Sequence, residues 1–298
     1  MKSYKKVLND LANENNLRKL SEDENRKLRQ TFLTAFQDIV KVCEKNNITV
    51  MLTGGSALGA VRHHGFIPWD DDMDIAMSRS DFERFKCLFK KELASEYMLS
   101  SPNYEGLVLN RFPQVLIKGT KFVGIESVGI SGPCCIAIDI FIIENVPDNK
   151  LLRIIKGIFC QGLMFIGSRV QSYEQKNSIL RKYMYKTVEG KKLYNKRLWV
   201  GKLFAVIPSK KWFDWIDKAC RYEKETNYMG TPTGRKHYFG EIRKHSTFVP
   251  ASKGTFEGIE VNLPGNPQDY LSNLYGDYMN VPPIEQREQH FIYEIEFN

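Results

Sequence analysis

The periodic part of the chain begins with an amphipathic helix. From residue 21 to residue 46, apolar side chains recur every three or four positions, which is the spacing of one helix face. Ser21 and Glu24 have the spacing of a capping box, and Asn46 followed by Asn47 ends the pattern. The sequence therefore predicts a helix over residues 21–46.

Strand and helix patterns then alternate over residues 48–144. A β-branched apolar run at 48–52 and a second apolar alternation at 73–77 predict two strands, with a short helix ending at His63 between them. Another helical pattern follows, and the stretch from 97 to 144 is rich in Val and Ile interrupted by Gly. This order of elements predicts an α/β (α+β) core.

Beyond Pro147 the chain becomes basic and aromatic with helical periodicity. Residues 151–170 are the most hydrophobic stretch, but Arg153, Lys156 and Gln161 interrupt it, so we do not expect a transmembrane helix. Two interpretations of this region stay open. Its helices pack on the core, or they form an interfacial surface that rests on anionic lipid.

Composition and charge narrow the classes of partner. The chain has 298 residues, 42% of them hydrophobic, with a net charge of +8 and a pI near 9.0, which favours anionic partners. We find no basic motif with interleaved aromatic residues, so nucleic acid is not an expected partner. Six scattered cysteines without a CxxC spacing, and an N-terminus without an apolar run, predict a cytoplasmic protein that has no signal peptide.

The strongest candidate chemistry is the acidic run Asp70-Asp71-Asp72-Met73-Asp74. If residues 72–74 are extended, the side chains of Asp72 and Asp74 point to the same face. Two such carboxylates repel each other unless a cation neutralises them, and Mg²⁺, or Mn²⁺ in its place, suits the site. Asp70 is expected in a loop, and Asp71 is expected to point away.

Asp139 is the predicted third member of this site. It lies within the apolar run 135–143, where an isolated carboxylate would be costly to bury. It is explained if an adjacent strand brings it to the same metal. The turn Gly54-Gly55-Ser56 would let the backbone approach a phosphate closely. The alternatives are a solvated acidic loop at 70–74 and a helix-capping or strand-end role for Asp139.

The segment from Leu52 to Ile75, which includes both the Gly-Gly-Ser turn and the acidic run, resembles the signature of the LicD family. The similarity returns in Phe256-Glu257-Gly258 and again from Tyr270 to Pro283, so it brackets residues 35–290, although 145–240 shows no clear match. The family includes bacterial phosphocholine transferases, is related to fukutin, and belongs to the nucleotidyltransferase-fold superfamily. One difference is Gly55-Ser56, where the family more often has Gly-Thr.

The resemblance implies a nucleotidyltransferase-like mixed sheet flanked by helices, with a helical annex. It further implies metal-dependent transfer of phosphocholine, or a related phospho-alcohol, from a CDP-activated donor to a hydroxyl of a glycan or glycolipid acceptor, with release of CMP. Teichoic acid and lipopolysaccharide are such acceptors. The metal ligands and catalytic residues would be Asp72, Asp74 and Asp139, and the enzyme would act in the cytoplasm at the inner face of the membrane.

Further substrate-binding candidates lie in or near these motifs. Arg62 either neutralises phosphate or pairs with Asp70 or Asp71, and Trp69 and Tyr275 either pack the loops or form part of an aromatic cage for a quaternary ammonium. Arg287 and His290 are one helical turn apart and could close over the site. The remaining candidates are Gly54, Gly55 and Ser56 at the donor phosphates, His63 as a substrate contact, Arg111 and Lys118 as weaker phosphate ligands, and Asp277 in the second motif.

Four segments follow from these patterns. They are an N-terminal helical segment (1–46), a nucleotidyltransferase-like catalytic core (47–147), a basic and aromatic helical region that faces membrane or acceptor (148–235), and a C-terminal segment that completes the site (236–298). Competing functions are a nucleotidyltransferase that uses an NTP, a non-catalytic glycan- or lipid-binding module, and a peripheral membrane scaffold.

Overall fold

The first described helix confirms its prediction. The computed structural model describes residues 18–124, 127, 132–284, 287 and 292–297, so residues 1–17 of the predicted first segment, and His290, lie outside the described residues. Helix α2 (Glu22–Lys45) has Ser21 as its N-cap. The Ser21 hydroxyl accepts from the Glu24 backbone N–H, and the Glu24 carboxylate accepts from the Ser21 N–H, which completes the predicted capping box.

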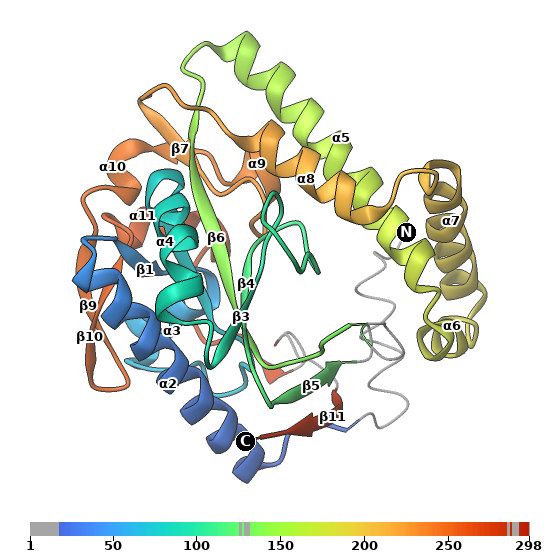
Figure 1. Cartoon of the computed structure of the whole chain (residues 1–298), viewed down its shortest axis with the longest axis horizontal. Helices are drawn as coiled ribbons and strands as arrows, with labels where there is room; N and C mark the ends of the chain where they lie inside the picture. Colours follow the sequence, from blue (N-terminus) through green and yellow to red (C-terminus); the bar gives the residue numbers. More distant parts are fainter. Residues whose placement is uncertain (1–17, 125–126, 128–131, 285–286, 288–291, 298) are drawn as a thin grey trace.

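A mixed sheet of seven described strands forms the centre of the molecule (Figure 1). Its main path runs β1-β2-β6-β4-β3, and β7 and β8 extend it from the far end of β6. Only β2 and β6 pair in parallel; the other pairs are antiparallel. The strands are β1 (Val50–Leu52), β2 (Asp74–Ser78), β3 (Tyr97–Ser100), β4 (Gln114–Ile117), β6 (Ala137–Val146), β7 (Tyr228–Gly230) and β8 (Arg243–Lys244).

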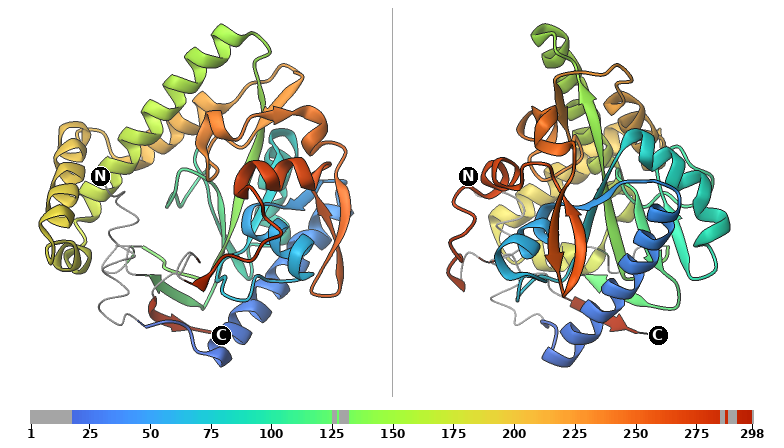
Figure 2. Two further views of the ribbon diagram at one scale, coloured as in Figure 1. Left: turned by 180° about the vertical axis from the view of Figure 1, so that it is seen from behind. Right: turned by 90° about the vertical axis from the view of Figure 1, so that its left-hand side faces the viewer.

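Helices flank this sheet, as the predicted fold class requires. Helices α2 and α4 (Arg79–Glu92) lie on one side of the sheet, and α3 (Gly54–His63) and α11 (Pro267–Tyr275) lie on the other (Figure 2). One difference concerns the Gly-Gly-Ser turn, which was expected to precede a helix beginning at residue 57. It is instead the first turn of α3, because Thr53 already acts as the N-cap.

The C-terminal part of the chain returns to the core. A hairpin of β9 and β10 packs near β1 and α3, and the short strands β5 and β11 pair with each other in antiparallel fashion. The elements are β5 (Lys121–Gly124), α9 (His237–Gly240), α10 (His245–Phe248), β9 (Ser252–Phe256), β10 (Ile259–Leu263) and β11 (Ile292–Glu296). Because this return brings α11 against α3, the Tyr270 hydroxyl of α11 accepts from the backbone N–H of Gly54 at 3.2 Å.

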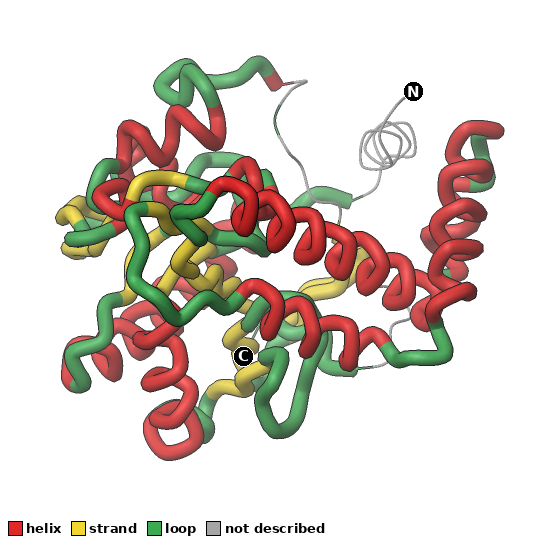
Figure 3. Tube along the Cα trace, turned by 90° about the horizontal axis from the view of Figure 1, so that it is seen from above, coloured by secondary structure: helices red, strands yellow, loops and turns green. Residues whose placement is uncertain are grey.

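Four helices form the annex that follows β6. Helices α5 and α8 run side by side, and α6 and α7 stand at one end of them (Figure 3). A Cβ on Gly201 would lie 2.1 Å from the backbone oxygen of Arg169, so α7 approaches α5 more closely than another residue would allow. The helices are α5 (Lys150–Gln175), α6 (Ser178–Met184), α7 (Val188–Phe204) and α8 (Ser209–Cys220).

A buried ion-pair network connects the annex to the core. Arg79, the first residue of α4, donates to Glu144 on β6 and to Asp217 on α8, the second contact at 2.8 Å. Arg221 also binds Asp217 at 2.8 Å. Although burial opposes it, the two arginines lower the pKa of Asp217, whereas burial raises the pKa of Glu144 despite its contact with Arg79. Charge, as well as apolar packing, therefore holds α8 on the sheet.

Among the described residues, α5 is the one helix that is long and apolar enough to cross a membrane by length and composition. One of its faces packs against α7 and α8, while only 22% of its most apolar window is buried. Because Arg153 and Lys156 bond backbone carbonyls of neighbouring segments, the helix is part of the annex fold. The four predicted segment boundaries stay a prediction, and β7, from the third segment, pairs with β6 of the second.

Candidate active site

The first turn of α3 lies directly against two carboxylates. Gly54 has a φ of +51°, and a Cβ at this position would lie 2.5 Å from Oδ2 of Asp74. A Cβ on Gly55 would lie 2.7 Å from Oδ2 of Asp70. The backbone N–H of Gly55 also donates to the Asp74 carboxylate. Glycine is required at both positions, because any side chain would occupy the space of the carboxylates.

The acidic run contributes three side chains to one cavity. The secondary structure from which they project differs partly from the prediction. Asp74 is the first residue of β2, so Asp72 lies in the extended segment before the strand. Asp72 and Asp74 nevertheless line the same cavity, as expected. Asp70 lies in a loop, as expected, and lines the cavity as well, although we did not count it among the site residues. Asp71 is absent from the described lining of this cavity.

The sheet register places Asp139, the third predicted carboxylate, beside Asp74. In the parallel pairing of β2 and β6, Asp139 is the direct partner of Asp74. Its Oδ1 accepts a hydrogen bond of 2.7 Å from Nε2 of Gln114, on the neighbouring strand β4. Asp139 therefore has a fixed orientation next to the cavity. This adjacency agrees with the expectation that an adjacent strand carries Asp139, and it follows from the order of strands in the sheet.

Asp74 has an unfavourable electrostatic environment. Burial raises the pKa of its carboxyl well above the usual range, and the nearby Asp72, Asp139 and Asp70 raise it further. Because neighbouring negative charges repel one another, a cation stabilises this group of four carboxylates. Their hard oxygen atoms are the donors that Mg²⁺ prefers, so the residues fit that ion. Within the described part of the chain, however, no three His, Cys, Asp or Glu side chains already have the spacing of a metal-ligand set.

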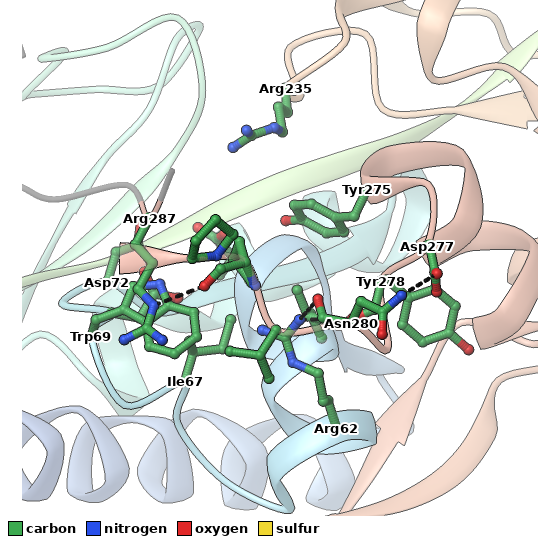
Figure 4. Close-up of a pocket in the computed structure, with 17 residues that line it drawn as sticks. Arg62, Ile67, Trp69, Asp72, Arg235, Tyr275, Asp277, Tyr278, Asn280 and Arg287 are labelled. Carbon is green, nitrogen blue, oxygen red and sulfur yellow. Dashed lines mark hydrogen bonds between the residues drawn. The ribbon is translucent and has the colours of Figure 1, made fainter. Parts of the chain in front are cut away.

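Three arginines line the same cavity, which has a volume of about 530 Å³. Figure 4 shows Arg235 extending from one wall, Arg62 from the wall across the cavity, and Arg287 beside Trp69 and Asp72. A cavity that combines carboxylates with guanidinium groups can take a ligand that carries both phosphate and a bound cation.

Arg62 is held by the second predicted motif. Its Nη1 donates to the backbone oxygen of Tyr278 at 2.7 Å, and its Nε donates to Nε2 of His63 at 2.9 Å. Burial lowers the pKa of its guanidinium, and nearby Arg287 lowers it further, whereas Tyr275 acts in the opposite direction. The side chain thus connects the α3 segment to the chain after α11 while it faces the cavity.

Aromatic side chains complete the lining. The guanidinium carbon of Arg287 lies 4.1 Å from the ring centroid of Trp69, and that of Arg235 lies 5.4 Å from the ring of Tyr275. Tyr275 and Asp277, both candidate substrate-binding residues, line the cavity. Burial, followed by Tyr270 and Asp74, raises the pKa of the Tyr275 hydroxyl. The faces of Trp69 and Tyr275 therefore contact cationic groups of the protein itself.

The structure places the other predicted residues in different positions. The Ser56 hydroxyl is buried and accepts the backbone N–H of Asp74 at 2.9 Å, so it positions the start of β2. His63 packs edge-on against Trp69. Lys118 donates to the backbone oxygen of Ala94 at 2.7 Å and does not line the cavity. Arg111 lines a separate cavity, described below.

Sequence reasoning missed three polar cavity residues, namely Asp70, Arg235 and Asn280. Asp70 was set aside on strand parity, yet the segment before β2 bends so that it meets Gly55. Arg235 lies in the region without a matched motif, where a Gly-Arg turn carries no distinctive signal. Asn280 lies between the second motif and Pro282, and this closeness was the only signal that could have found it.

Comparison with known proteins agrees with this geometry. The family model described as "LicD/FKTN/FKRP, nucleotidyltransferase domain" matches residues 47–120, which include α3, β2 and the acidic run. The class of protein that the fold and site resemble over these residues is therefore a nucleotidyltransferase domain. The lipopolysaccharide cholinephosphotransferase LicD of Haemophilus influenzae is 26% identical over 263 residues, which cover 85% of this chain and 90% of that protein. The chain is thus similar to the LicD family, over residues 47–120 in the family model and over most of its length in this relative.

Two shorter matches are confined to a small part of the chain. The uncharacterized protein RT0683 of Rickettsia typhi is 44% identical over 50 residues, or 17% of this chain and 16% of that protein. The uncharacterized protein RP689 of Rickettsia prowazekii is 47% identical over 45 residues, or 15% of this chain and 17% of that protein. These relatives carry no information about function.

Proposed function

We propose that this protein transfers phosphocholine, or a related phospho-alcohol, from a CDP-activated donor to a hydroxyl of a cell-surface glycan precursor, and that it releases CMP. The observation that carries the proposal is the cavity itself, in which the carboxylates of Asp70, Asp72 and Asp74 face the guanidinium groups of Arg62, Arg235 and Arg287. A diphosphate donor needs both kinds of group. The similarity to a lipopolysaccharide cholinephosphotransferase over most of the chain supports the transferred group and the acceptor class.

In this proposal Asp72 and Asp74 hold Mg²⁺, with Asp139 beside them. When bound, the ion would screen the negative charge of the donor diphosphate. The three cavity arginines bind the phosphate oxygens and stabilise the charge that develops on departing CMP. The first-turn amides of α3 add a positive dipole end at the same place.

The chemical step is a substitution at phosphorus. The acceptor hydroxyl oxygen forms a bond to the phosphorus atom that carries the alcohol, while the bond from that phosphorus to the bridging diphosphate oxygen breaks. The bridging oxygen leaves with CMP. Asp139, which Gln114 holds in place, orients the hydroxyl or accepts its proton.

The direct test is to incubate the purified full chain with Mg²⁺ and, in separate reactions, CDP-choline, CDP-ethanolamine and CDP-glycerol, and to measure CMP. We expect Mg²⁺-dependent CMP release from one of these donors and none in EDTA, because the carboxylate cluster would then lack its cation. Pyrophosphate release from CTP or another NTP would instead identify a nucleotidyltransferase. Absence of turnover with every nucleotide, together with glycan binding, would identify a binding module.

We also propose that the annex rests on an anionic membrane surface, where a lipid-linked acceptor would be found. Exposed apolar residues recur at helical spacing along α5, for example Leu151 (68% exposed), Ile155 (57%) and Ile158 (62%). Residues 150–220 carry 16 Lys and Arg against 4 Asp and Glu, whereas the whole chain has a net charge of only +8. An apolar stripe bordered by positive charge is typical of helices that lie in a lipid interface.

An Ile158→Glu substitution is expected to weaken binding to phosphatidylcholine vesicles that contain phosphatidylglycerol by about tenfold or more, because it places a negative charge on the inserted face. Tyr293→Glu, on β11 and 60% exposed, is the matched control and should bind like the wild type. Vesicle co-sedimentation measures both. Equal binding by Ile158→Glu and the wild type would contradict a membrane-facing α5.

A further inference from the structure

A second cavity, of about 420 Å³, lies between the segment before β4, the annex helices and α9. Its lining includes Arg111 before β4, Arg169 on α5, Arg197 on α7 and His237 on α9. Among the described residues, no Asp or Glu lines it. Four basic side chains from four separate elements thus meet in one space whose described lining holds no carboxylate.

Arg111 is the most informative residue of this cavity. Its Nε is buried without a hydrogen-bond partner, and its Nη2 has only a long contact of 3.5 Å to the backbone oxygen of Thr233. No ion pair of Arg111 with a carboxylate is found in the described part of the chain. Burial lowers the pKa of its guanidinium, Cys220 opposes this effect in part, and nearby Arg197 adds a smaller lowering. A buried guanidinium in this state is stabilised by an anion.

The fold holds the other basic groups in place around Arg111. Arg197 donates from Nε to the Ser172 hydroxyl at 2.6 Å, and Arg169 donates from Nη1 to the Ser168 hydroxyl at 2.8 Å, so both are fixed against α5. The guanidinium of Arg169 also lies 4.3 Å from the ring centroid of Phe165. Guanidinium groups fixed in this way bind phosphate oxygens with little loss of side-chain entropy.

This second cavity, called the basic cavity here, lies next to the candidate active site. The latter is called the aspartate cavity, because Asp70, Asp72 and Asp74 line it. Arg235 lines the aspartate cavity and His237 lines the basic one, and since only one residue separates them, their Cα atoms lie within about 7.6 Å of each other. A second connection runs through Gln114, which binds Asp139 and accepts from Asn110, the residue before Arg111. A group bound at Arg111 would therefore lie close to the carboxylates of the proposed reaction centre.

The apolar part of the lining indicates that the ligand also has a hydrocarbon part. Met164 and Phe165 face the same space as the basic residues, and Phe165 is 52% exposed at the continuation of the apolar stripe of α5. A ligand that fits this cavity carries a phosphate group for the arginines and hydrocarbon for Phe165. The donor diphosphate has its own binding groups at the aspartate cavity, so the anion at Arg111 belongs to the second substrate.

We propose that this basic cavity binds a phosphate group carried by the acceptor glycolipid, and so selects phosphorylated, membrane-borne acceptors. The inference rests on the proposed function, because it assigns the cavity to the second substrate of that reaction. It predicts that acceptor recognition and donor recognition respond to different substitutions.

The test compares two defined probes, n-octyl glucoside and n-octyl glucoside 6-phosphate, whose binding to the full chain is measured by titration calorimetry. The phosphorylated probe is expected to bind about ten- to a hundredfold more tightly, and Arg111→Met should remove this preference. Arg169→Gln, at a residue whose side chain contacts Ser168 and Phe165 of its own helix, should reduce the preference and provides a second variant if Arg111→Met does not fold. Asp74→Asn should leave it unchanged.

Because this measurement is of binding, it stands apart from the test of CMP release, and either result can fail without the other. Equal binding of the two probes by the wild type would overturn the inference. Competition by CDP-choline for the phosphorylated probe would assign the cavity to the donor, which also overturns it. Inorganic phosphate that binds as tightly as the phosphorylated probe, with the same dependence on Arg111, would identify a site for the free ion in place of an acceptor subsite.

Discussion

An Asp74→Asn variant is expected to release CMP from the CDP-alcohol donor about a thousandfold more slowly than the wild type, at the same Mg²⁺ concentration. Asp74 begins the central strand β2, contacts the first-turn amide of Gly55, and has Asp139 as its strand partner. An amide keeps the shape of the side chain but removes the charge that attracts the cation. A coupled assay of CMP release against Mg²⁺ concentration measures the loss.

The same variant should be no less stable than the wild type when metal is absent. Burial and the neighbouring carboxylates raise the folded-state pKa of Asp74. A raised carboxyl pKa contributes stability at pH values below the unfolded pKa, and this contribution is lost as the pH rises through the folded pKa. At neutral pH the Asn side chain removes the unfavourable charge. Mg²⁺ should therefore raise the melting temperature of the wild type and have little effect on Asp74→Asn.

Asp71→Asn is the matched control for this experiment, because it removes a charge from the same acidic run at a residue that does not line the cavity. Its rate should stay within about threefold of the wild type. Full CMP release by Asp74→Asn, or by the wild type in EDTA, would contradict the proposed metal-dependent reaction.

An Arg79→Met variant is expected to lose about 3–5 kcal/mol of unfolding free energy at neutral pH, because removing one partner leaves uncompensated buried charges. Arg79 binds both Glu144, which is 1% exposed, and Asp217, which is 6% exposed. One oxygen of Glu144 is already buried without a partner, so the carboxylate has no other compensation for the loss of Arg79. Urea unfolding followed by circular dichroism measures the difference.

The loss of unfolding free energy in Arg79→Met depends on pH, and the direction of this dependence can be derived. Arg79 and Arg221 lower the folded-state pKa of Asp217, so the stability that it contributes is present at neutral pH and is lost as the pH falls through that pKa. The deficit of Arg79→Met should therefore shrink on acidification below about pH 4. Lys45→Met is the control, since Lys45 pairs with Glu92 at the surface and should cost less than about 1 kcal/mol. A similar loss in both variants would contradict the structural importance of the network.

Local structure was largely predictable from the sequence. The capping box of α2, the buried strand β1 and the apolar residues of β6 all have short-range signals, and each element lies where its pattern predicts it. The fold class also follows, because strand and helix patterns alternate over residues 48–144. Element boundaries were less accurate: α3 begins at Gly54, since a positive φ lets glycine start the helix there.

The candidate site was predictable only in part. Asp72, Asp74 and the two glycines belong to one continuous motif, so their proximity was readable from the chain. Asp70 was misjudged, because side-chain parity applies only within a regular strand and β2 begins four residues later. Arg235 comes from a segment far along the chain without a matched motif, and only the folded loop brings it to the cavity.

By itself, the sequence determined the acidic motif, the glycine turn, the order of helices and strands, and the resemblance to the LicD family. These features depend on the spacing of neighbouring residues, which backbone geometry converts directly into faces and turns. The tertiary structure alone decided that Asp139 pairs with Asp74, that three arginines face the carboxylates, and that Arg111 belongs to a second basic cavity. Those relations depend on which strands pair and which helices pack together, and such long-range contacts have no fixed spacing along the chain.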